Sequence, residues 1–85
     1  MKLPTPEVTS DIPSKDQCVH LCSQLTPVER AVLVMAATGL SNKWIARRSG
    51  RALKTVEAVR ARVFDRLGVA NIARASAIAA KAGLV

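Results

Sequence analysis

Three side chains of the kinds that bind metal ions lie close together near the start of this chain: Cys18, His20 and Cys22. In a helix, two cysteines four positions apart share one face, whereas His20 between them points to another side. A structural zinc site needs four ligands, and no fourth candidate lies nearby. We therefore expect no metal ion and no cofactor, and we expect Cys18 and Cys22 to be free thiols.

Several classes of function find no support in the sequence. His20 is the only histidine, the acids are scattered, and no glycine-rich phosphate loop is present, so we expect no enzyme. No apolar run approaches the length that spans a membrane, and the first residues do not resemble a secretion signal. We expect a cytoplasmic protein without membrane contact, whose cysteines stay reduced.

Positive charge is concentrated in the larger part of the chain. The formal net charge is +7, and residues 25–85 contain eleven Lys and Arg against three acids, whereas residues 1–24 contain two against three. A basic domain of this kind is typical of proteins that bind the phosphates of nucleic acids. A solvated surface that only prevents aggregation is the alternative, and the charge alone leaves it open.

The residues that start and stop helices predict an all-α chain. Three prolines indicate an extended arm over the first thirteen residues. "SKDQ" is a capping box that favours a short helix over 14–23, and "TPVE" starts a helix at Pro27 whose apolar stripe is Val28, Val32, Met35 and Ala36. The remaining helices are predicted over 42–49, 53–67 and 72–82, each preceded or followed by a capping residue or a glycine.

The helices over 42–49 and 53–67 have the outline of a helix-turn-helix. A short helix, a turn containing Gly50 and a longer basic helix follow one another, and in that motif the second helix enters the major groove of DNA. Short turns also occur in any small helical bundle, so this outline alone leaves both interpretations open.

The residues at particular positions are more specific than this outline of helices and turns. "LTPVERAVLVMAATGLSNKWIARRSG", followed by "KTVEAVRARVFDRLGV", closely resembles the LuxR-type helix-turn-helix that is also found in the FixJ and NarL response regulators. The resemblance covers 25–85 and implies a four-helix domain there, preceded by an arm over 1–24 that contains the extra short helix. With no receiver or autoinducer domain before it, the chain is similar to the free-standing GerE proteins.

The resemblance also implies a function. It suggests a dimeric, sequence-specific transcription regulator that binds double-stranded DNA with the recognition helix 53–67 in the major groove. RNA polymerase or another regulator would be a further partner. By the family pattern, Glu57, Ala58 and Ala61 face the bases. Contacts to phosphates are assigned to Lys43, Lys54, Thr55, Arg60 and Arg62. Arg51 replaces an apolar residue of the family pattern and is either a further phosphate contact or a solvated side chain.

Several residues depart from the family pattern and leave a second function open. Family members commonly place long polar side chains at the base-facing positions, whereas this chain has an acid and two alanines there. Glu57 can accept a hydrogen bond from cytosine, and the alanines can touch thymine methyl groups, so base discrimination should be modest. Ala52 replaces the capping Ser or Thr of the recognition helix, which usually costs about 1 kcal/mol. The alternative is a regulator that keeps the fold but acts by binding another protein.

Two further features allow more than one interpretation. Trp44 lies in the helix over 42–49 and either packs on the N-terminal segment of its own chain or contacts a protein partner. In the last helix, Ala73, Ala77 and Ala80 form a strip of small residues on the side away from the core. We expect this strip to form the interface of a homodimer, the alternative being an alanine strip exposed to solvent.

Overall fold

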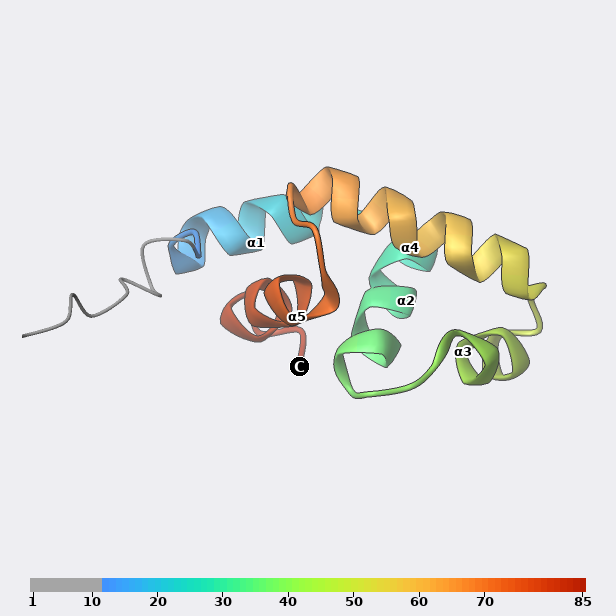
Figure 1. Ribbon diagram of the computed structural model, residues 1–85. Coiled ribbons are helices and arrows are strands. Elements are labelled where there is room, and N and C mark those ends of the chain that lie inside the picture. The colour runs from blue at the N-terminus through green and yellow to red at the C-terminus, as the bar shows by residue number, and fades with distance from the viewer. Residues whose placement is uncertain (1–11) are drawn as a thin grey trace, which may run out of the picture.

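The computed structural model describes residues 12–85 and shows five helices (Figure 1). They are α1 (Lys15–Ser23), α2 (Pro27–Ala37), α3 (Asn42–Ser49), α4 (Leu53–Leu67) and α5 (Ile72–Lys81). No strand occurs in this part of the chain, which confirms the predicted all-α class. Most of the predicted extended arm falls on residues 1–11, which lie outside the described residues.

Side-chain caps start four of the five helices as predicted. The side chains of Ser14 and Thr26 each accept a hydrogen bond from the backbone N–H three residues later, and their own backbone N–H groups donate to the side chains of Gln17 and Glu29, so both capping boxes are complete. Ser41 and Asn71 cap α3 and α5. These bonds satisfy backbone N–H groups that the first turn of a helix leaves unpaired.

The predicted end of the last helix was one residue too late. It was expected to include Ala82, but α5 ends at Lys81, because Ala82 is already the C-cap and Gly83 follows with φ at 83°. The left-handed backbone of this glycine cannot continue a helix. At α3 and α4 the predicted glycine ends are confirmed, since Gly50 and Gly68 both have φ at 69°.

The core lies between α2 and the helices around it. Helix α2 packs against α3, α4 and α5, and α4 contributes four buried apolar side chains to the same core, namely Val56, Val59, Val63 and Leu67. Helices α1 and α4 run along one edge of the molecule, with the other three helices on one side of them (Figure 1). The side of α4 that faces away from those helices is left exposed.

The apolar stripe predicted for α2 was too narrow. Leu33 was not included, yet its side chain is fully buried, whereas Val28 and Met35 are only half-buried. A helix that contacts neighbours on several sides buries more than one stripe. The prediction of a single apolar stripe therefore underestimated how much of the surface of α2 is buried.

Helix α1 is held to the rest of the domain by its buried cysteines and by Arg30 of α2. Cys18 and Cys22 are buried, and the Arg30 guanidinium of α2 lies 3.4 Å from the Cys22 carbonyl oxygen and 3.5 Å from that of Leu25. Both cysteines are free thiols, and burial raises the pKa of the Cys22 thiol, which favours its neutral form. These thiols fill space in the core.

Candidate nucleic-acid interface

The exposed side of α4 carries few cations along its centre. Its core side holds the valines, so the residues opposite them at helical spacing point outward. These exposed residues, here called the outer line, are Lys54, Glu57, Ala58, Ala61 and Asp65. The outer line thus combines one cation with two acids and two methyl groups, and the arginines of α4 lie to either side of it.

Two arginines on the side of α4 nearest α2 share one carboxylate. Arg66 Nε lies 3.0 Å from Glu29 Oε1 and 3.1 Å from Oε2, and Arg62 Nε lies 3.5 Å from Oε2. The arginine side chains keep 45% and 55% of their surface exposed, whereas Glu29 keeps 2%. Each guanidinium can therefore face solvent or a ligand while it remains tied to α2.

Glu29 is held as an anion although it is buried. The backbone N–H of Thr26 donates to Glu29 Oε1 at 2.9 Å and is the main cause that lowers the pKa of Glu29. Burial opposes this effect, and the hydrogen bonds and positive charges of Arg66 and Arg62 reinforce it. The carboxylate thus caps α2 and fixes the position of α4 at once.

On its other side, α4 is tied to α3 through Arg60. Arg60 Nη1 donates to Asn42 Oδ1 at 3.1 Å, and its guanidinium carbon lies 5.6 Å from the centre of the Phe64 ring. Asn42 is the first residue of α3. This contact fixes the two helices of the motif relative to one another.

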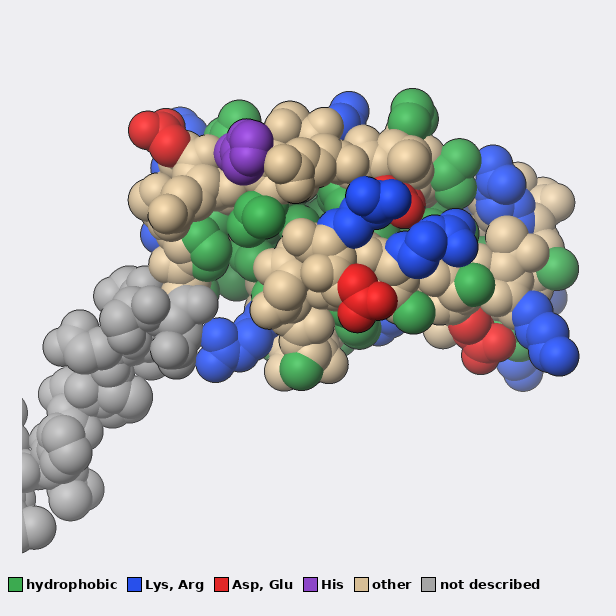
Figure 2. Space-filling view, turned by 90° about the horizontal axis from the view of Figure 1, so that it is seen from above, with side chains coloured by type: hydrophobic (Ala, Val, Ile, Leu, Met, Phe, Trp, Pro, Cys, Tyr) green, Lys and Arg blue, Asp and Glu red, His purple; other side chains and the backbone are tan. Residues whose placement is uncertain are grey.

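The resulting surface has a geometry suited to a groove in duplex DNA. Phosphates line the two walls of a groove and base edges lie between them. On α4, arginines occupy both sides and the outer line lies in the middle. Figure 2 views the molecule from the α1 and α4 edge and shows acidic side chains among the Lys and Arg side chains of this face.

The remaining residues assigned to phosphates are exposed in the first turns of α3 and α4 and in the turn between these helices. Arg51 belongs to the turn, Lys54 and Thr55 to the first turn of α4, and Lys43 to the first turn of α3. Ala52 is the N-cap of α4 and makes no side-chain hydrogen bond, as the sequence indicated. The first backbone N–H groups of α4 are consequently left without a side-chain partner, next to these cations.

The structure also shows where the alanine strip of α5 and Trp44 of α3 lie. Ala73 and Ala80 are exposed and Ala77 is half-buried, and all three lie on the side of α5 opposite the buried Ala75 and Ile78. Over residues 12–85, Trp44 keeps 53% of its surface exposed, with the Arg47 guanidinium carbon 5.5 Å from the centre of the ring.

The sequence did not identify four residues that organise this surface. They are Glu29, Asn42, Asp65 and Arg66. Glu29 was assigned only to its cap, because its arginine partner lies 37 residues away and no local pattern reveals such a pair. Asp65 could have been found, since it continues the helical spacing of Ala58 and Ala61.

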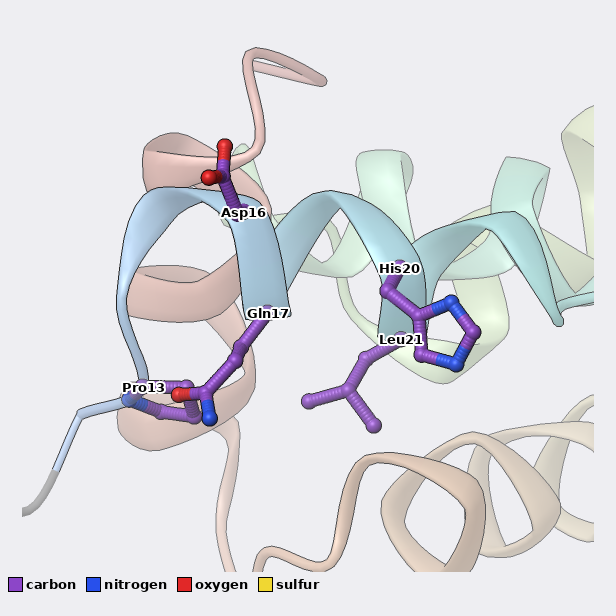
Figure 3. A pocket seen from close by; sticks show the side chains of 5 residues that line it. All are labelled: Pro13, Asp16, Gln17, His20 and Leu21. Carbon is purple, nitrogen blue, oxygen red and sulfur yellow. The ribbon is translucent and has the colours of Figure 1, made fainter.

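A hollow lies away from this surface, on α1. It has a volume of about 450 Å³ and is lined by Pro13, Asp16, Gln17, His20 and Leu21 (Figure 3). Figure 3 shows the Asp16 carboxylate directed away from His20, and the Gln24 side chain lies within hydrogen-bond distance of the His20 ring. The two titratable groups of the hollow thus form no acid–base pair.

Helix α3, the turn through Gly50 and the partly cationic α4 together define a helix-turn-helix domain. The profile of the family described as bacterial regulatory proteins, luxR family (GerE), matches residues 23–79. The chain belongs to this family, as the resemblance predicted, and is thereby a regulator of the DNA-binding type.

Comparisons with curated proteins and with solved structures gave no significant match. No helix of the described residues is long and apolar enough to cross a membrane.

Proposed function

We propose that this protein is a sequence-specific transcription regulator that binds as a homodimer, with α4 of each copy in the major groove of a roughly palindromic duplex. Residues 25–85 form the DNA-binding domain and 1–24 an arm. The observation that carries the proposal is the exposed outer line of α4 with arginines on both sides, on a helix-turn-helix of the luxR family. Promoter occupancy, or contact with RNA polymerase or another regulator, is the output.

The bases are read by the first part of the outer line. Glu57 accepts a hydrogen bond from the amino group of cytosine, and the methyl groups of Ala58 and Ala61 pack against thymine methyl groups. None of the three can form the two hydrogen bonds that arginine makes with guanine. Base contacts therefore supply modest discrimination, and most of the affinity comes from phosphates.

The phosphates are bound from both sides of α4. Arg60, whose guanidinium is positioned by Asn42, binds a phosphate on the wall of the groove nearest α3. Arg62 binds a phosphate on the opposite wall, nearest α2. The other proposed phosphate contacts are Lys43, Arg51, Lys54 and Thr55. Because Arg62 is half-exposed while paired with Glu29, it can bind a phosphate without giving up the carboxylate.

The dimer forms through the alanine strip of α5. Small side chains let two helices approach closely across a two-fold axis, and Ala73, Ala77 and Ala80 are the residues that would meet there. The recognition helices of the two copies would then lie one helical turn of DNA apart, about 34 Å.

Duplex binding at a series of salt concentrations tests the proposal. Binding driven by phosphates weakens steeply with salt, and Lys54→Ala should lower the slope of log affinity against log salt by about one. Lys15→Ala removes the same charge from α1 and should leave the slope unchanged. An affinity for duplex no greater than that of an unrelated basic protein would contradict the proposal.

A second candidate function has a specific observation in its favour. The outer line contains Glu57 and Asp65 against the single cation Lys54, which is unfavourable beside a polyanion. A regulator that binds another protein through this fold would need no cationic outer line. Weak, unspecific duplex binding in the salt series would favour this function over promoter reading.

A further inference from the structure

Helix α3 exposes an aromatic and cationic surface that DNA binding by α4 does not require. Trp44, Arg47 and Arg48 are all exposed, and α3 contains no acid. Trp44 is the most exposed of the large apolar side chains in the described residues, at 53%. We call these three residues the Trp44 face.

The Trp44 face is turned away from α4. Asn42 receives the hydrogen bond of Arg60, and Ala46, four residues later, is buried, so these two residues mark the side of α3 toward α4 and the core. A helix advances about 100° per residue, which places Trp44 about 200° from Asn42, and Arg48 follows Trp44 at four positions. A duplex bound along the outer line of α4 would leave this side of α3 accessible.

The contact between Trp44 and Arg47 holds an aromatic ring and a cation side by side on the Trp44 face. With the Arg47 guanidinium carbon 5.5 Å from the ring centre, the cation interacts with the face of the indole, and the guanidinium keeps donors for a carboxylate. Exposed tryptophan and arginine are the two residue types most enriched where binding energy is concentrated. A partner that presents an apolar group beside an anionic group could therefore bind the Trp44 ring and the Arg47 guanidinium together.

We propose that the Trp44 face binds an acidic amphipathic segment of a partner protein while α4 occupies DNA. An apolar side chain of the segment packs on the Trp44 ring, and carboxylates bind Arg47 and Arg48. Charge complementarity selects this partner, because two cations flank one aromatic ring and no anion of α3 opposes them. This surface is distinct from the DNA interface and does not depend on it.

The test uses a defined probe, a fluorescein-labelled helical peptide of about 15 residues whose glutamates surround leucines at helical spacing. Its counterpart has lysine at each glutamate. Peptide anisotropy is measured with the full chain, free and bound to duplex. The acidic peptide should bind both forms, Trp44→Ala and Arg47→Ala should each weaken binding about tenfold, and the lysine peptide should not bind the free chain.

Matched variants separate a binding surface from general electrostatics. Val19→Ala removes an exposed apolar side chain of α1, and Lys15→Ala removes an exposed cation of α1; both should bind the acidic peptide like the unchanged chain. Equal binding by Trp44→Ala, competition between duplex and peptide, or no peptide binding would each overturn the inference. Circular dichroism checks that Trp44→Ala is folded, and its duplex affinity should be unchanged.

Discussion

At the residue scale, Glu29 determines how α4 is held against α2. Its carboxylate caps α2 through the Thr26 N–H and binds two arginines of α4, so one side chain joins two helices. Removing one partner from a buried pair leaves the others uncompensated. Because Arg62 and Arg66 are half-exposed, water can replace part of what they lose.

Glu29→Gln should therefore lower the free energy of unfolding by about 2 kcal/mol, the usual worth of a hydrogen bond to a charged group. Glutamine can still accept from Thr26 but cannot pair with the arginines as an anion. Urea denaturation at neutral pH measures the loss. A matched change, Glu57→Gln, removes an exposed acid of the outer line and should change stability by less than about 0.5 kcal/mol. An equal effect of both substitutions would show that the ion pairs contribute nothing.

The lowered pKa of Glu29 also makes stability depend on pH. A carboxyl whose pKa is lower in the folded chain than its ordinary value of 4.5 stabilises the fold fully above that value. This contribution is lost as the pH falls below about 4.5 and through the folded pKa. The stability difference between the unchanged chain and Glu29→Gln should accordingly shrink toward low pH. A difference that stays constant from neutral to acidic pH would mean that another group dominates.

Glu57 is the residue whose removal should alter the sequence that the protein prefers. If its carboxylate accepts from a cytosine amino group, Glu57→Ala should abolish the preference for cytosine at that position, a discrimination of about 1 kcal/mol. Sequencing of duplex fragments selected by the purified protein reads this preference. Asp65→Ala removes the same charge from the outer line and should keep it. A preference that survives Glu57→Ala would assign reading to other residues.

At the scale of single helices, the start of α4 is the least supported of the five. Ala52 takes the backbone conformation of an N-cap, with φ −67° and ψ 148°, but has no side-chain acceptor. Ala52→Ser would place a hydroxyl within reach of the Thr55 N–H and should stabilise the chain by about 1 kcal/mol. Urea midpoints measure the gain. Ser41→Ala, which removes the existing cap of α3, should cost a similar amount, and two changes of the same sign would contradict this account of the caps.

The sequence predicted these helices well because local chemistry determines where they begin and end. Ser14, Thr26, Ser41 and Asn71 cap helices through hydrogen bonds that span three residues, and glycines end them. How α4 is held against its neighbours could not be predicted. That depends on Arg60 meeting Asn42 and Arg66 meeting Glu29, which are pairs 18 and 37 residues apart.

Contacts between residues far apart in the sequence also determine how the arginines of the candidate interface are held. The sequence identified the helix over 53–67 as basic and assigned Arg60 and Arg62 to phosphates, but it did not reveal which neighbours hold these arginines. Helical spacing puts Arg60 and Arg62 on different sides of α4, whereas the acceptor that each one meets, Asn42 on α3 or Glu29 on α2, depends on how the helices pack. The centre of the exposed side is poor in cations because of the sequence of α4 itself, which places Glu57, Ala58, Ala61 and Asp65 there at helical spacing.

At the scale of the whole molecule, the domain leaves one side of α5 uncovered, where we propose that a second copy binds. The core side of this helix is covered by α2, and α1 and α4 also contact it. What remains outward at its centre is the alanine strip, with Ala73 and Ala80 exposed. A chain of 85 residues has a small core, so association would also add stability that the single domain lacks.

Ala77→Glu should break such a dimer, because two carboxylates would be brought together beside the two-fold axis and larger side chains would keep the helices apart. Sedimentation should then report monomers, and affinity for a palindromic duplex should fall about 100-fold as the second recognition helix is no longer held near its half-site. Binding to a single half-site should remain. Ala31→Glu makes the same change at an exposed alanine of α2 and should leave the dimer intact. If Ala77→Glu sediments and binds like the unchanged chain, the two copies meet elsewhere, and the spacing between their α4 helices must be set by another surface.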